Sequence, residues 1–157
     1  MPRPHKRQTR RRRSTAHAAR RPKPQRAPRP TSAETHLLRL AREITGLPLA
    51  AAIETLTAAW APGAALPRDV AQAFLKSRGD KTAALALAWA REQVRLALEE
   101  IVAARPKPQR RRIEAGPDLL AWLLLAACES IAHEPPSAVV ERVSAILELS
   151  GHGATAG

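Results

Sequence analysis

The stretch "DKTAALALAWAREQVRLALEEIVAA", residues 80–104, indicates the fold more clearly than any other part of the chain. Its apolar residues recur at the spacing of an α-helix, with the core candidates Leu87, Ala90, Val94, Ala97 or Leu98, and Ile101. Asp80 is a favourable N-cap, because its carboxylate can accept from the first free backbone N–H groups. Arg95 and Glu99 are four residues apart and form a helical ion pair on the solvent side. The stretch therefore predicts a long helix over residues 81–104.

Three shorter helices are expected before this stretch. The sequence "TSAE" is a capping box, with Thr31 as N-cap and Glu34 three residues later. The remaining start and stop signals are Gly46, Pro48, Trp60, Pro67 and Gly79. They predict a first helix that ends at Gly46, a second from Pro48 to about Trp60, and a third from Pro67 to just before Gly79.

Two more helices are expected after it. Pro106 and Pro108 end the long helix, Pro117 opens a fifth helix that runs to about His133, and Ser137 caps a sixth that stops at Gly151. The inward residues expected on the sixth helix are Val139, Val140, Val143, Ile146 and Leu147. No segment shows the sustained alternation of a strand. The sequence thus predicts an all-α domain of about six helices over residues 32–151, followed by a disordered C-terminus, 152–157.

Charge divides the 157 residues into two unequal parts. Residues 1–31 hold 12 Lys and Arg and no acidic residue, so the other 14 basic residues balance the 14 acidic ones and the net +12 belongs to this segment. Because it has almost no apolar side chains, we expect a disordered tail. Its phosphate-binding candidates are Arg10, Arg11, Arg12, Arg13, Arg20, Arg21, Lys23, Arg26 and Arg29. Such a tail binds nucleic acid independently of base sequence, unless it is only a solubilising or codon-biased extension.

The hexapeptide "RPKPQR" occurs at residues 21–26 and again at 105–110. The second copy continues into two further arginines, and this secondary basic loop contains Arg105, Lys107, Arg110, Arg111 and Arg112. Both copies combine an extended, proline-rich backbone with positive charge. The identity of the two copies has two explanations, a shared function or chance in an Arg/Pro-rich chain.

Signals of catalysis are absent from the sequence. The five histidines are scattered, there is no HExxH or CxxC motif and no glycine-rich phosphate loop. Cys128 stands among apolar residues and is expected in the core. We therefore expect a protein without enzymatic activity, without a bound metal ion and without a cofactor. The N-terminus lacks the apolar segment of a secretory signal, and the longest apolar run, Leu119 to Cys128, is too short for a membrane span. These features predict a cytoplasmic protein without membrane contact.

The fifth predicted helix, within "GPDLLAWLLLAACESIA", is apolar nearly all round. A surface helix of a monomer normally keeps a polar face. We therefore expect this helix and the sixth to form a four-helix interface with a second copy. The candidate interface residues are Leu120, Trp122, Leu123, Leu124, Val139, Val143, Ile146 and Leu147.

The segments "RRRIEAGPDLLAWLLLAACESIA", "HEPPSAV" and "VERVSAILELSG" together resemble the C-terminal domain of TetR-family transcriptional regulators. The likeness extends over residues 80–151 and more loosely over 32–79. It implies a homodimer formed by the last two helices and an apolar effector pocket formed by the preceding ones. Trp60, Phe74 and Trp89 are candidates for lining such a pocket, with ordinary core packing as the alternative.

The chain departs from that family because it lacks a clear helix-turn-helix. The segment "PLAAAIETLTAAW", where a recognition helix would lie, has none of the Arg, Lys, Asn or Gln side chains that read base edges best. The sequence therefore predicts a regulator-like or accessory nucleic-acid-binding protein with a cationic arm. Two alternatives stay open: a helical module for protein interaction or small-molecule sensing that does not bind DNA, and a truncated regulator.

Overall fold

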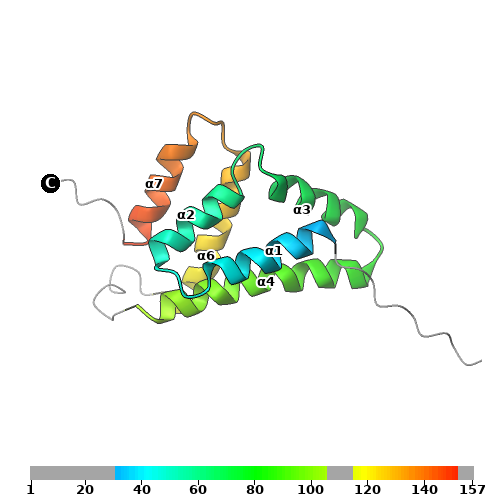
Figure 1. Ribbon diagram of the computed structural model, residues 1–157, viewed down its shortest axis with the longest axis horizontal. Helices are drawn as coiled ribbons and strands as arrows, with labels where there is room; N and C mark the ends of the chain where they lie inside the picture. The colour runs from blue at the N-terminus through cyan, green and yellow to red at the C-terminus, as the bar shows by residue number, and fades with distance from the viewer. Residues whose placement is uncertain (1–30, 106–114, 152–157) are drawn as a thin grey trace, which may run out of the picture.

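The computed structural model describes residues 31–105 and 115–151, and all regular elements in these two ranges are helical. The elements are α1 (Ser32–Ile44), α2 (Leu49–Ala59), α3 (Ala65–Lys76), α4 (Lys81–Ala103), α6 (Pro117–Ser130), the short 3-10 helix η1 (Ile131–His133) and α7 (Val139–Leu149) (Figure 1). The all-α prediction is confirmed for these residues. The predicted tail, the basic loop beyond Arg105 and the C-terminus from residue 152 lie outside them.

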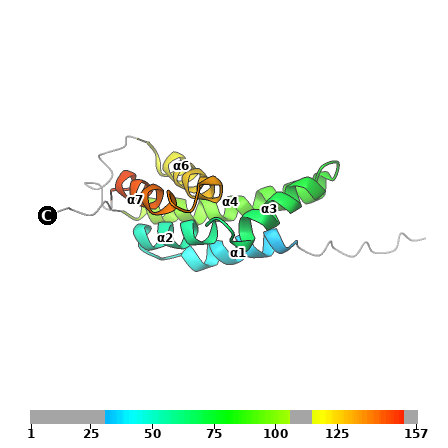
Figure 2. The same cartoon turned by 90° about the horizontal axis from the view of Figure 1, so that it is seen from above.

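The long helix α4 is the centre of the fold. It packs most extensively against α1 and α6. Seen from above, α6 and α7 lie on one side of α4, and α1 and α2 lie on the other (Figure 2). The largest fully buried side chains come from these helices and from η1: Leu37 and Ile44 of α1, Ile53 and Leu56 of α2, Val94 and Leu98 of α4, Leu125 and Cys128 of α6, and Ile131 of η1.

The chain returns through α2 and α3 between α1 and α4, so these two neighbours run in the same direction (Figure 1). The predicted starts of both are confirmed. The Thr31 hydroxyl accepts from the backbone N–H of Glu34 at 3.2 Å and donates to its carboxylate at 3.0 Å. Asp80 accepts from the N–H groups of Thr82 and Ala83 at 3.0 and 3.1 Å. Both caps satisfy donors that a helix start leaves unpaired.

Two of the three glycines expected at helix ends illustrate the backbone that this role requires. Gly46 follows α1 with φ 77°, and Gly151 follows α7 with φ 82°. In this left-handed region a Cβ atom is unfavourable. The predicted ion pair on α4 is also present, with Arg95 Nη1 donating to Glu99 Oε2 at 2.8 Å.

The predicted start of the last helix was wrong. Ser137 makes no capping bond, and α7 begins at Val139 with Ala138 as its N-cap. The backbone N–H of Ala138 donates to Pro135 O at 2.8 Å, so a turn occupies the residues where the helix was expected to start. Val140, predicted to point inward, is 77% exposed. The preceding α6 is shorter than expected and passes into η1 at Ile131.

Candidate functional site

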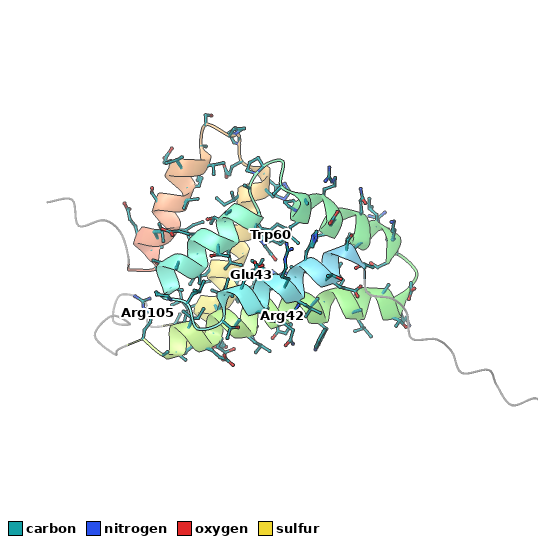
Figure 3. All side chains as sticks on the ribbon, in the orientation of Figure 1. Arg42, Glu43, Trp60 and Arg105 are labelled. Carbon is teal, nitrogen blue, oxygen red and sulfur yellow. The ribbon has the colours of Figure 1, made fainter. Side chains whose placement is uncertain are left out.

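An apolar cavity of about 240 Å³ lies between α1, α3 and α4, near the end of α2. Its apolar walls include Leu37, Trp60, Val70, Phe74 and Leu87. Trp60 directly follows α2 and points into the interior of the fold (Figure 3). Its Nε1 is buried and has no hydrogen-bond partner in the described part of the chain. A buried donor left in this state costs about 1–3 kcal/mol.

The structure brings two of the three candidate aromatic residues to this cavity. Trp60 and Phe74 line it, whereas Trp89 does not. The alternative of plain core packing holds for Trp60, which is buried, and fails for Phe74 and Trp89, which are 60% and 57% exposed. The reason for Trp89 is helical geometry: two residues along α4 from the buried Leu87, it points to the opposite side.

One wall of the cavity is an ion pair that joins α4 to α6. Arg91 donates from Nε and Nη2 to the two carboxylate oxygens of Glu129, each at 2.7 Å. These hydrogen bonds raise the pKa of the Arg91 guanidinium above its ordinary value. A bidentate pair of this kind is among the stronger polar contacts in proteins. The two charges are paired with each other, so this wall of the cavity holds α4 and α6 together.

Arg105, the only described member of the secondary basic loop, is engaged within the fold. Its Nη1 donates to the backbone carbonyl of Ser150 at 2.7 Å, at the C-terminal end of α7 (Figure 3). A cation there complements the partial negative charge of the helix end. Arg105 therefore joins the end of α4 to the end of α7, and its expected role as a loop cation for an external anion stays a prediction. Lys107, Arg110, Arg111 and Arg112 lie outside the described residues.

The two copies of "RPKPQR" connect to different places on the fold. Thr31, where the described chain begins, lies at the start of α1, and Arg105, the first residue of the second copy, lies at the end of α4. Because α1 and α4 run in the same direction, these two points are at opposite ends of the helix pair (Figure 1). The segments before residue 31 and after residue 105 therefore start from separate parts of the surface.

The eight candidate interface residues separate into three groups. Leu124 and Ile146 are buried in the core of the single chain, so they were wrongly expected to face a second copy. Trp122 and Leu123 are exposed, at 49% and 44%. The half-buried ones pack against the core: Leu120, Val139, Val143 and Leu147. Exposed apolar side chains therefore remain on the outer side of α6, and α7 exposes Val140 and Leu149, which were not among the eight.

Candidate metal ligands do not gather in the described part of the chain. Within residues 31–105 and 115–151, no three His, Cys, Asp or Glu side chains are placed to hold a metal ion. Cys128 is buried, as predicted, and burial raises the pKa of its thiol to about 12. A thiol with such a pKa is not a nucleophile near neutral pH. None of the described helices combines the length and apolarity needed to cross a bilayer.

Two surface features were not predicted from the sequence. Three exposed cations lie where α3 passes into α4: Lys76, Arg78 and Lys81. An exposed apolar stripe also follows the outer side of α4, with Leu85, Trp89 and Leu96. The spacing of these three residues, offset from the core stripe of the same helix, was the available signal.

Comparisons of the chain with protein-family models, with curated proteins and with solved structures find no match in any of the three. Functional assignment therefore depends on the residues and geometry of this chain.

Proposed function

We propose that the protein is a regulator-like or accessory nucleic-acid-binding protein whose N-terminal basic segment neutralises phosphates without reading bases. The observation that carries this proposal is the separation of charge. The whole net charge of +12 belongs to residues 1–31, and the remaining residues are balanced. Segregated Arg and Lys without acidic neighbours release counterions from a polyanion. The resemblance to TetR C-terminal domains supports the regulator-like part of the proposal.

The place where the basic segment joins the fold supports the same function. Thr31 begins α1, whose first turns lie beside α3, and His36 Nδ1 is 3.1 Å from Asp69 Oδ2 on that helix (Figure 1). The exposed side of α3 carries Arg68 and Lys76. Neither of these cations makes an ion pair within the described residues. A polyanion held by the basic segment would therefore meet further positive charge on the domain.

Deletion of residues 1–30 tests this proposal. We expect loss of binding to DNA without loss of the fold, because the core of the described residues, which begins at Ala33, is kept whole. If the intact protein contacts about 8 phosphates, log K falls with log[salt] with a slope of about −7. The paired change Arg68→Gln/Lys76→Gln should make the slope less steep by about 2 units. Arg142→Gln on α7 is the matched control and should leave it unchanged.

Electrophoretic retardation and fluorescence anisotropy at several salt concentrations measure both effects. Retained binding after the deletion, or binding that does not respond to salt, contradicts the proposed mechanism. Circular dichroism of the shortened protein establishes that the helices persist.

The cavity beside Trp60 favours a second candidate function, the sensing of a small apolar molecule. Its volume of about 240 Å³ is slightly below the range typical of drug-sized ligands, so only a compact molecule would fit. A molecule that binds the folded state should raise the melting temperature by several degrees at a large excess over Kd. Phe74→Ala, at the cavity, should abolish that shift, and Trp89→Ala, an exposed aromatic residue outside the cavity, should not. A shift that survives Phe74→Ala contradicts binding in this cavity.

A further inference from the structure

The outer side of α4 is an apolar surface that the core does not use. Leu85, Trp89 and Leu96 are 70%, 57% and 39% exposed. On a helix that turns about 100° per residue, these three side chains project within about 40° of one another. The buried residues of α4, such as Val94 and Leu98, point the opposite way. In Figure 1, α4 forms the lower edge of the molecule and α1 lies above it. Leu96 also lines a groove that α4 shares with α1.

The residues on this side follow the spacing of a coiled-coil seam. Alternating steps of three and four residues give the series that we call the outer stripe: Thr82, Leu85, Trp89, Glu92, Leu96, Glu99 and Ala103. That alternation keeps one line of side chains toward a neighbouring helix along its whole length. Ala86 and Ala88 flank the stripe near Leu85, so a second helix can approach closely there.

Charge is distributed unevenly along the stripe. Lys81 stands at its start, and Glu99 and Glu100 stand near its end. Arg95 holds the two carboxylates inside the stripe, with hydrogen bonds of 2.7 Å to Glu92 and 2.8 Å to Glu99. The bond from Arg95 lowers the pKa of Glu92. Lys81 and Glu100 are both exposed, and neither has an ion-pair partner within the described ranges.

We propose that the outer stripe of α4 pairs with the same stripe of a second copy of this chain, in antiparallel orientation. An antiparallel partner brings the positive start of one stripe to the negative end of the other, and the symmetry makes each contact occur twice. Residues at the same level of the two stripes then have numbers that sum to about 181. Lys81 faces Glu99 of the second copy, which lies on the same flank of the stripe, and Leu85 faces Leu96 of the second copy. Trp89 faces Glu92, whose carboxylate can accept from the indole N–H.

A parallel arrangement fits the same stripe poorly. It would place Glu92 against Glu92 and Glu99 against Glu99 of the second copy, and like charges in a seam oppose pairing. The charge pattern therefore selects both the partner, a second copy, and its direction. This interface is separate from the outer side of α6 and does not depend on nucleic-acid binding.

Sedimentation velocity of the full chain, from micromolar to submillimolar concentration, tests the pairing. The intact protein should dimerise, and the dimer should weaken as salt screens its ion pairs. Leu85→Asp should leave a monomer, because it places a carboxylate in the centre of each apolar contact. The matched control is Trp122→Asp, which changes an exposed apolar residue on α6 and should leave the dimer intact.

Charge reversal tests the register. Lys81→Glu and Glu99→Lys should each weaken dimerisation by about tenfold or more, since each change creates two like-charge contacts. The double variant should restore it to near the original value. Both substitutions suit the helix, since Glu belongs near its start and Lys near its end, so loss of helix does not explain a weaker dimer.

Three results would overturn the proposal. They are a native protein that stays monomeric at every concentration, a dimer that Trp122→Asp splits while Leu85→Asp does not, and a double charge reversal that fails to rescue. The shortened protein without residues 1–30 should dimerise as the full chain does, which separates failure of this proposal from failure of nucleic-acid binding.

Discussion

The helices α4 and α6 are alike on their inner sides and differ on their outer sides. Leu98 of α4 and Leu125 of α6 are both completely buried where the two helices pack. On the outside, α6 exposes Leu119, Trp122 and Leu123 within little more than one turn. The exposed apolar residues of α4 instead extend over three turns and lie between a lysine and a pair of glutamates. An exposed apolar surface indicates a contact site on either helix. Only on α4 do charged residues at the two ends of that surface also indicate what kind of partner binds there.

This difference also shows that the apolar composition of a helix is a poor guide to whether the helix lies in a dimer interface. The α6 sequence is the more apolar of the two, and that property suggested a shared dimer helix. Much of its apolar surface is used inside the chain, because α6 packs against both α2 and α4. The α4 sequence, with its arginines and glutamates, has the composition of an ordinary amphipathic helix, yet it retains the longer unpartnered apolar face.

The largest expected effect concerns the inner sides. Leu98→Ala and Leu125→Ala should each lower the free energy of unfolding by about 2–5 kcal/mol, through lost burial and the cavity left behind. Leu119→Ala, on the exposed side of α6, should change it by less than about 0.5 kcal/mol. Urea denaturation followed by circular dichroism measures all three. A small loss from either inner substitution would mean that the two helices are not packed as closely as the structure has them.

Most of the fold could be predicted from the sequence because its signals are local. Capping by Thr31 and Asp80 and the left-handed glycines at 46 and 151 are decided within a few residues. The core stripe of α4 follows directly from its period. The start of α7 could not be predicted in the same way, because Pro135 and Ala138 form a turn that competes with the Ser137 cap.

The candidate site depended on contacts between distant residues, and the sequence predicted it less well. Arg91 and Glu129 are 38 residues apart, and Arg105 and Ser150 are 45 apart. No local pattern links either pair. Trp60, Phe74 and Trp89 were grouped as candidates for a pocket without regard to helix face, which placed Trp89 with Trp60 although Trp89 points to the other side of α4. To predict the outer stripe, a second series of regularly spaced residues had to be recognised on α4, although the core residues already accounted for the apolar periodicity of this helix.

The smallest expected effect distinguishes the two outer sides directly, by fluorescence quenching of variants in which a single tryptophan remains. Trp60 is 6% exposed and should be shielded from iodide at every protein concentration. Trp89 and Trp122 are about half exposed, so both should be quenched in dilute solution.

When concentration drives pairing through α4, Trp89 should become less accessible because it enters the interface, whereas Trp122 should stay as it was. The reverse pattern would move the interface to α6 and restore the sequence-based expectation. Equal quenching of the two at all concentrations would leave neither face in a dimer. The experiment needs Trp→Phe replacements only. At positions 89 and 122 they keep an exposed aromatic ring, so the stability of the fold should not influence that comparison.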